Sequence, residues 1–533
     1  MNWLERTIET VSPGWSSRRD TARLRSKVTR SQMEALSTYE AADKSRLTND
    51  WPSQNKTADQ AILPDYPTLV ARGRGAVRDN WIAESIVSGY LRHVVGSGIT
   101  ARAKARDPIT GEPLVEYNKI LDRKWLRWAT RKNLCDVEGK KTFVEFQNLS
   151  VSEDVTVGQA FTIMCYIPRV DEIGLALQQI EPEQLDRTKT FNQDTGNEIR
   201  DGIEIDDFGK TAAIWVSRRE QKHTRSFFDS ERVPADRILH LMRQRRVRQT
   251  YGVSRLTSVI NEMHHLKMYE EYTVIRARLE ACMGVSIETE IGGPAGIANG
   301  LFAGGTGTGY TEDTNENPIF NFEPGMVNQL PAGKKANFHA NQTPGNQFEP
   351  FTVRQTKNIA AGAGLDYPTV SRDYTGGSFT SQRQGQIELW DSTDPEQQRL
   401  INDWCQPIRE EFIRIAFLEG RISVPGVFAL EIPDELMLTD WQPKPKLWID
   451  PKNQADAARI QIEQVLNTRE RILNQQGEDF RETVLESSEE KKFAADNGVT
   501  FPENANDPAP VETEPEPEVV KPLQPTIVKR TGT

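Results

Sequence analysis

Hydrophobic positions in the first third of the chain recur at the spacing of helices and then change to alternation. Apolar side chains from 76 to 95 return every three or four residues, which predicts a buried helix face that ends at Gly96. The same spacing predicts helices over 116–130 and 143–158. From 161 onward the chain has short runs typical of strands, namely AFTIMCYI, LALQQIEP, GIEID and KTAAIWV. These patterns predict an α+β protein in which a helical region precedes the strands.

The second half of the chain is predicted to be mostly helical, with one long polar interruption. Apolar residues mark one face of a helix over 254–282, and Ser254 is expected to be its N-cap. The segment 283–350 is rich in glycine and polar residues, which favours a flexible insertion. A second helix is expected over 351–365.

Capping residues predict where the later helices begin. Asp394 followed by Pro395 is typical of an N-cap and a first helical position, and Pro407 is expected to kink the helix that follows. Three further helices are predicted at 454–466, 469–476 and 479–493.

Both ends of the chain have biased compositions. Residues 1–60 are predicted to form a flexible arm that is locally basic, with Arg18, Arg19, Arg23, Arg25, Lys27 and Arg30 close together. This arm is either a solvated extension or a leg that orders on neighbouring subunits or contacts nucleic acid. Residues 496–533 are rich in proline and acidic residues and are predicted to be extended and disordered.

The overall composition limits the classes of function. The net charge of −11 argues against a chain that binds phosphates over its whole surface, so any contact with nucleic acid is expected in local patches. The four cysteines are far apart in the sequence and match no zinc spacing, which favours reduced thiols. No apolar run approaches the roughly 20 residues that span a bilayer, and the N-terminus lacks the apolar core of a signal peptide. We therefore expect a soluble protein made inside the cell, without a membrane partner.

No recognisable catalytic constellation stands in the sequence. The run GGTGTG lacks the Lys-Ser/Thr ending of a phosphate-binding loop, no Gly-x-Ser-x-Gly elbow occurs, and the six histidines match no metal motif. We expect no enzyme activity, no cofactor and no metal. One dense basic run, RQRRVR, could contact DNA or form ion pairs at a subunit seam through Arg243, Arg245, Arg246 and Arg248.

The segment 351–390 has a distinct pattern. A helix with small residues at its end leads into a polar, glycine-rich loop, and a Ser/Gln/Arg-rich stretch then opens another helical region. Nothing in it can form a nucleophile–base pair or bind a metal. The pattern therefore indicates a structural element that presents a mobile loop.

Several segments, in this order along the chain, resemble tailed-phage portal proteins of the lambda-type family. The similarity covers most of residues 60–495. The segments are Arg78-Asp79-Asn80 with Val94–Ile99, GIEIDDFGKTAAIWV, HLMRQRRVRQTYGVS, FEPGMVNQLPAGKKANF, KNIAAGAGLDYPTVSRDYTGGSFTSQR and Trp448-Ile449-Asp450-Pro451. Val247 and Tyr251 depart from the usual residues of the third segment, and Ala363 stands where the fifth usually has leucine.

The resemblance implies a cyclic assembly of roughly twelve copies, built from heterologous contacts. Such a ring stands at one capsid vertex of the virion, after assembly in the host cytoplasm. Its implied partners are further copies of itself, the terminase large subunit, major capsid or scaffold proteins, head-completion proteins and the double-stranded DNA that passes through the channel. The portal itself hydrolyses nothing.

The resemblance also implies a division of the chain into parts. These are a basic arm (1–60), a wing (60–250), stem helices (254–282 and 351–365), a clip (283–350), a channel loop (366–382), a long kinked helix with a return to the wing (383–450), crown helices (451–495) and a tail (496–533).

The channel loop is the candidate functional site. A loop that touches moving DNA needs backbone freedom and modest polar contacts, and the residues expected to face DNA supply both: Arg372, Asp373, Tyr374, Thr375, Gly376, Gly377, Ser378, Phe379 and Arg383. The same loop could instead pack between subunits. The alternative function is another packaging or minor capsid protein, either scaffold-like or nucleic-acid-processing, that has no channel.

Overall fold

The computed structural model describes residues 13–37, 46, 52, 54–217, 230–282, 286–289, 310–312, 318–320, 334–337, 345–375, 377–444, 451–476 and 480–499. The chain divides into two units, Met1–Ala61 and Ile62–Thr533. Among the described residues, no helix is long and apolar enough to cross a membrane. The predicted tail lies outside the described residues from 500 onward.

The first unit contains a long helix where a flexible arm is predicted. Helix α2, Pro13–Ser37, runs for 25 residues. Its sequence contains five arginines, which are good helix formers, and it has no proline or glycine after Gly14. The predicted arm is therefore helical over this range.

The predicted helix over 76–95 is two helices and a π-helical turn. Helix α4, Tyr66–Asp79, ends at Asn80, and α5, Trp81–Tyr90, begins there before the π turn Leu91–Val95. The side chain of Asn80 accepts a hydrogen bond from the amide of Ile82 and donates one to the carbonyl of Met263 at 3.1 Å. Asn80 therefore caps α5 from an extended conformation and interrupts the helix.

The predicted helices over 116–130 and 143–158 are confirmed as α6, Val115–Thr130, and α8, Phe143–Thr156, with the short α7, Lys132–Cys135, between them. Aromatic rings of α6 and α8 form the centre of the main core. Trp125 lies 5.0 Å from Phe143 and 5.1 Å from Phe412, measured between ring centroids. The core is therefore shared between these helices and the helix that contains Phe412, Gln406–Leu418.

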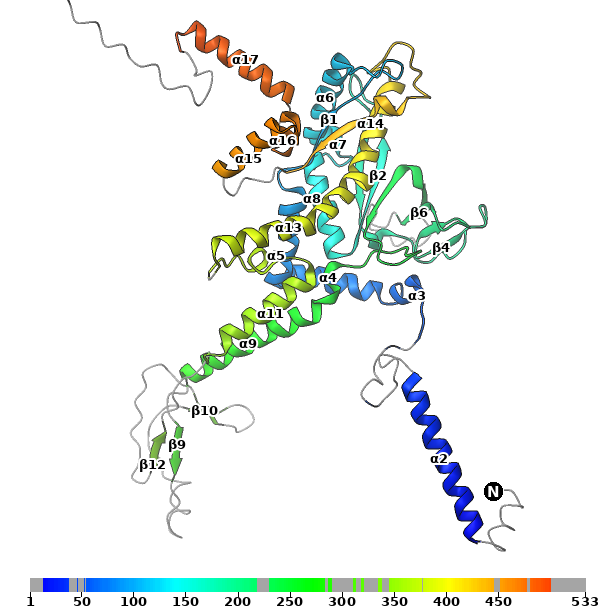
Figure 1. The fold of residues 1–533 in the computed structure, drawn as a ribbon, viewed down its shortest axis with the longest axis vertical. Coiled ribbons are helices and arrows are strands. Elements are labelled where there is room, and N and C mark those ends of the chain that lie inside the picture. The colour runs from blue at the N-terminus through cyan, green and yellow to red at the C-terminus, as the bar shows by residue number, and fades with distance from the viewer. Residues whose placement is uncertain are drawn as a thin grey trace, which may run out of the picture. The chain divides into compact units, whose positions relative to one another are not determined.

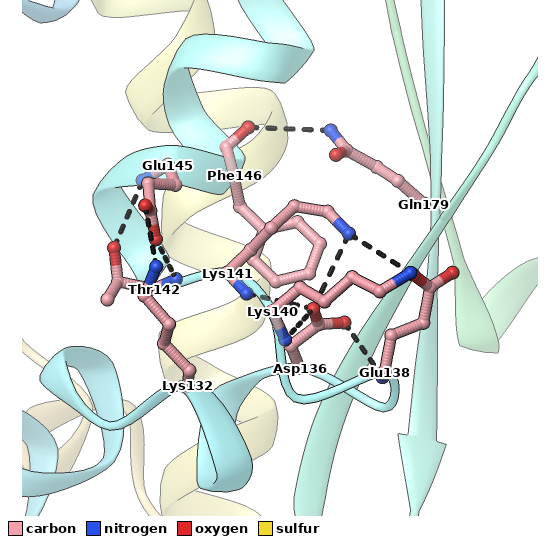
Figure 2. Close-up of polar contacts among 9 residues, drawn as sticks. All are labelled: Lys132, Asp136, Glu138, Lys140, Lys141, Thr142, Glu145, Phe146 and Gln179. Carbon is pink, nitrogen blue, oxygen red and sulfur yellow. Dashed lines mark hydrogen bonds and ion pairs between the residues drawn. The ribbon is translucent and has the colours of Figure 1, made fainter.

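The loop before α8 is held by two carboxylates (Figure 2). The buried Asp136 carboxylate accepts hydrogen bonds from the amides of Glu138, Lys140 and Lys141. The Thr142 hydroxyl accepts from the amide of Glu145, whose carboxylate accepts in turn from the amide of Thr142. This capping box fixes the start of α8.

The predicted strands are confirmed within two antiparallel sheets. The first has the order β3-β2-β8, and the second is a meander with the order β4-β5-β6-β7. A separate pair joins β1 to β13, which are distant in sequence. The bounds are β1 Thr100–Ala103, β2 Gln159–Tyr166, β3 Leu175–Ile180, β4 Glu198–Arg200, β5 Ile203–Ile205, β6 Thr211–Ser217, β7 Ser230–Pro234, β8 Ile238–Met242 and β13 Thr439–Gln442. The fold is thus α+β, as predicted.

Helices α9, Ile260–Cys282, and α11, Phe348–Ala363, lie side by side (Figure 1). Ser254 does not cap the long helix as predicted, because its side chain caps a 3₁₀ turn over Arg255–Ser258 instead. The first residue of α9 is therefore Ile260.

Between these two helices the structure describes only short strand pairs and the approach to α11. Strand β9, Ser286–Thr289, pairs with β12, Lys334–Asn337, and β10, Tyr310–Glu312, pairs with β11, Pro318–Phe320. Most of the predicted insertion over 283–350 lies outside the described residues.

The long helix begins earlier than predicted. Helix α13 spans Phe379–Leu400 and has Pro395 inside it, so Asp394 is not an N-cap. A π turn, Ile401–Cys405, leads directly into α14, Gln406–Leu418. Pro407 stands in the first turn of α14, directly after the π turn, where the helix is already irregular.

Three helices close the described chain. They are α15, Pro451–Glu463, α16, Arg469–Gln475, and α17, Phe480–Asp496. Their positions agree with the three predicted helices to within three residues.

Candidate functional site

The predicted loop over 366–382 is shorter in the structure. Helix α11 ends at Gly364, whose φ of 82° is the left-handed conformation that favours glycine. A five-residue helix, α12, Tyr367–Ser371, follows it, and the amide of Ser381 in α13 donates to the Ser378 hydroxyl. Apart from the extended Asp366 before α12, the described irregular backbone of the predicted loop therefore lies at 372–375 and 377–378.

Asp373 organises this stretch. Its carboxylate accepts hydrogen bonds from the amide and the hydroxyl of Thr375, at 2.9 and 2.7 Å, and from the Tyr367 hydroxyl at 3.1 Å. The bonds from Thr375 and Tyr367 hold the pKa of Asp373 below its usual value. The first half of the loop is therefore a defined turn that is fastened to α12.

The other predicted loop residues are mostly open to solvent. Arg372 has a left-handed backbone with a φ of 57°, and the Tyr374 side chain is 60% exposed. The exposed positions of the predicted set are Arg372, Tyr374, Thr375, Gly377, Ser378 and Arg383, and Asp373 is half-buried. Gly376 and the side chain of Phe379 lie outside the described residues. Hydroxyls and guanidinium groups of this kind can donate to phosphates but supply no acid–base pair.

The loop is linked to the base of α9 through Tyr90. The Tyr90 hydroxyl donates to the carbonyl of Ala363 at 2.8 Å, and the Arg255 guanidinium lies 4.6 Å from the centroid of the Tyr90 ring. Arg92 also donates to the carbonyl of Thr369 in α12. The last residue of α5 and the π turn after it therefore hold both sides of the α11–α12 corner.

A buried group of charges joins three further elements at Arg255. Asp154 of α8 lies 3.5 Å from Arg255 and 2.5 Å from Arg399, and Glu396 of α13 is ion-paired with both arginines. We call Asp154, Arg255, Glu396 and Arg399 the ionic junction. Burial alone would raise the pKa of Glu396, but the charges of Arg255 and Arg399 hold it below the usual value.

The basic run wraps around a buried glutamine. The side-chain oxygen of Gln249 accepts from the amides of Arg245 and Arg246, and its amide group donates to the carbonyl of Tyr251. The four arginines of the run are exposed, and Arg248 has a φ of 58°. Arg243 lies 3.7 Å from Glu396, which connects the run to the ionic junction.

The ionic junction could not be identified from the sequence. Its members are separated by up to 245 residues along the chain, and single charged residues have no periodic pattern. The one signal was Arg255, a charged residue beside Leu256 at the start of an apolar helix pattern.

In the part of the chain that the structure describes, we find neither a metal site nor a reactive thiol. No group of three or more His, Cys, Asp or Glu side chains there could hold a metal ion. Cys135 and Cys405 are buried, and burial raises the pKa of both thiols, so they remain protonated.

Comparisons with known proteins define the class. The family model for phage portal proteins of the lambda family matches residues 44–397. The chain is 28% identical over 465 residues to a probable portal protein of Halomonas phage phiHAP-1, which covers 85% of this chain and 86% of that protein. It is 21% identical to portal protein B of Escherichia phage lambda, over 83% of this chain and 86% of that protein. A solved chain in the virion of a native gene transfer agent particle covers 77% of this chain and 93% of its own length, at 10% identity and a TM-score of 0.42.

The chain belongs to the lambda family of phage portal proteins. It is a phage portal protein, as the ordered segments predict.

Proposed function

We propose that this portal protein forms a closed ring around a DNA channel at one capsid vertex. DNA enters through the ring during packaging by the terminase large subunit and leaves through it at ejection. Head-completion proteins bind the ring later, and major capsid or scaffold proteins surround it. In this proposal α9 and α11 are the stem, the stretch between Ser371 and Phe379 lines the channel, and α15–α17 form the crown.

The main support for a ring comes from the outer half of α9, residues 267–278. Leu266 is buried, but none of the described side chains from 267 to 278 is buried in the single chain. Tyr269 contacts α11, where it stacks on Phe348 and meets Phe351 edge to face. At its base, Lys267 of this half also donates to the carbonyl of Asp79. The exposed apolar side chains further along the helix form a surface that a partner must cover.

That apolar surface faces two sides. Tyr272 and Ile275 are 65% and 48% exposed and lie on one side of α9, because three residues make nearly a full turn. Val274 is 57% exposed and lies about 160° from Tyr272 and about 100° from Ile275 around the helix axis. A heterologous ring needs two different contact surfaces on each subunit, and α9 offers one on each side.

The proposed channel surface follows from the loop and from the net charge. Arg372, Tyr374 and Arg383 can make brief contacts with phosphates. An acidic chain with few cations along the DNA path neutralises few phosphates, which favours sliding over tight binding.

Replacing Tyr272 and Ile275 with glutamate tests the ring. The purified double variant is expected to be monomeric in mass photometry where the natural chain is a ring. Burying two such side chains contributes about 3–6 kcal/mol for each interface, so the interface is expected to weaken by a factor of at least about 100.

Phe208→Glu is the matched control, because Phe208 is 91% exposed in a turn between β5 and β6. The control should still form rings, and helix content by circular dichroism should match in all three proteins. Rings of normal size from the double variant would contradict the proposed stem interface.

A further inference from the structure

The basic run, residues 243–248, is a fixed turn that the proposed stem and channel do not use. The side-chain oxygen of Gln249 accepts hydrogen bonds from the amides of Arg245 and Arg246, so the backbone of the turn is held in place. Val247 is 90% exposed, and the four arginines of the run are exposed as well. The turn therefore presents an apolar side chain among cations.

Positive charge is concentrated beside this turn. Arg243 lies 3.7 Å from Glu396 of the ionic junction, a carboxylate that already has two arginine partners there. Partial burial lowers the pKa of Arg245, and the charges of Arg243 and Arg255 lower it further. A surface that brings carboxylates to the run would relieve this repulsion.

Another side of α13 carries exposed carboxylates. Glu388 and Asp391 are exposed, and Ile387 beside them is 37% exposed. We call these three residues the acidic face of α13. At about 100° per residue, Glu388, Asp391 and Ile387 lie about 80°, 140° and 180° around the helix axis from Glu396. Because Glu396 faces the run, the run and the acidic face lie on different sides of one helix.

Ring symmetry makes a contact between these two surfaces possible. Rotation about the axis brings each point of one copy to the same height on the next copy, so surfaces that meet must lie at similar heights. The acidic face precedes Glu396 by five to nine residues, which is about 8–14 Å along α13. Arg243 of the run is ion-paired with Glu396, so the run lies beside the same helix. The two surfaces are therefore close in height and on different sides, as a heterologous contact requires.

We propose that the basic run of one copy binds the acidic face of α13 in the next copy of the ring. The arginines of the run meet the two carboxylates of that face, and Val247 packs against Ile387. This inference rests on the proposed ring, and it adds a contact at α13 to the stem contact through α9. Opposite charges across the seam also fix how neighbouring copies are aligned.

The observations favour a second copy of the chain over DNA as the partner of the run. Backbone amides often donate to phosphates, but those of Arg245 and Arg246 already donate to Gln249. A phosphate backbone also offers no apolar surface to Val247. Arginine together with exposed apolar side chains is typical of protein interfaces.

Two double variants of the full-length chain test the contact. R245E/R248D reverses two charges of the run, and E388R/D391R reverses those of the acidic face. Aspartate is used at 248 because it tolerates the left-handed backbone there, which has a φ of 58°. Each variant alone places like charges across the seam, so the protein concentration at which half of the chain is in rings should rise at least about tenfold. Mass photometry over a dilution series measures this concentration.

A mixture of the two variants separates a direct contact from a folding defect. In an equimolar mixture, the reversed run of one variant faces the reversed helix of the other, and at the next seam the natural run faces the natural helix. Mixed rings should therefore form at nearly the same concentration as rings of the natural chain. Helix content by circular dichroism should match in all samples.

R123E/R131E is the matched control, because it makes the same change of net charge as the run variant at two exposed arginines in and directly after α6. It should form rings like the natural chain. Normal rings from both test variants, or no recovery in their mixture, would overturn the inference.

A run variant that forms normal rings but binds a labelled duplex more weakly than the control would assign the run to DNA and would also overturn the inference. Absence of rings from the natural chain would overturn the proposed function and this contact together. The other results leave the ring intact, so the two failures are distinguishable.

Discussion

The ionic junction shows how single residues hold the proposed stem to the body of the protein. Removing charges from water is costly, and a buried pair is stable only when each charge keeps its partners. Asp154 has Arg255 and Arg399 as partners, and Glu396 has the same two arginines. Because these residues come from α8, α13 and the turn before α9, one network fixes the angle between three elements.

His240 is a half-buried polar residue that makes the stability depend on pH. Its ring stacks on Phe161 at 4.3 Å, and its Nε2 lies 2.9 Å from the side-chain oxygen of Gln159. Burial lowers the pKa of His240 from 6.5 to about 3. The folded protein therefore keeps this ring neutral where the unfolded chain would protonate it.

Acid should destabilise the protein through His240. Because the pKa is lower in the folded state, this contribution is complete above pH 6.5 and is lost progressively as the pH falls from 6.5 towards 3. At pH 5 the loss is at most about 2 kcal/mol. Thermal unfolding between pH 7.5 and 5 measures the loss.

His240→Gln is the control, since glutamine keeps a polar partner for Gln159 and does not titrate. It should show a shallower fall of the midpoint with acid than the natural chain. The same pH dependence in both proteins would contradict the assignment of this loss to His240.

At the scale of elements, the sequence predicted those helices whose structure depends mainly on their own residues. Helices α6 and α8 were predictable because their apolar spacing is regular and because Thr142 and Glu145 form a capping box. The break at Asn80 was not, since its side chain bonds to Met263, which is 183 residues away. Long-range partners of this kind leave no periodic signal.

The alternation of apolar and polar residues predicted the strand GIEID, but it did not predict which side chains surround Glu204 in the fold. Glu204 stands between Ile203 and Ile205, and its side chain is fully buried. Its carboxylate accepts hydrogen bonds from Arg232, Asn197, Thr195 and Asn192. Together these bonds outweigh the effect of burial and lower its pKa from 4.5 to about 2. Only the folded sheet brings these donors together.

The candidate loop was predictable in place but not in detail. Polar residues around Gly377 indicated a loop, and the structure has one there. Helix α12 was missed, although Pro368 in its first turn is a typical start signal. The N-cap role of Ser378 was missed because Asp394 and Pro395 gave a stronger local signal for the next helix.

Shortening the loop tests whether it lines the channel. Deleting Thr375–Gly377 keeps Ser378 as the cap of α13, so helix α13 should be retained. Rings should still form, while the amount of DNA packaged or retained in particles should fall several-fold. Quantitative PCR of nuclease-protected DNA measures the fall.

A variant with Gly-Ser-Gly in place of these three residues separates loop length from side-chain identity. If the loop acts by reaching the DNA, this control should package more DNA than the deletion. Failure of the deletion variant to form rings would instead show that the loop packs between subunits.

At the scale of the whole molecule, the single chain leaves apolar surface uncovered. The outer half of α9 exposes apolar side chains on two sides. Further copies of the chain would cover this surface in the proposed ring.

Particle imaging tests the central claim most directly. Class averages of the purified full-length chain by electron microscopy should show closed rings with an axial hole wide enough for a duplex of about 20 Å. Copy number is then read from the rotational symmetry of the end-on views. Compact monomers, or open filaments without an axial hole, would contradict the account.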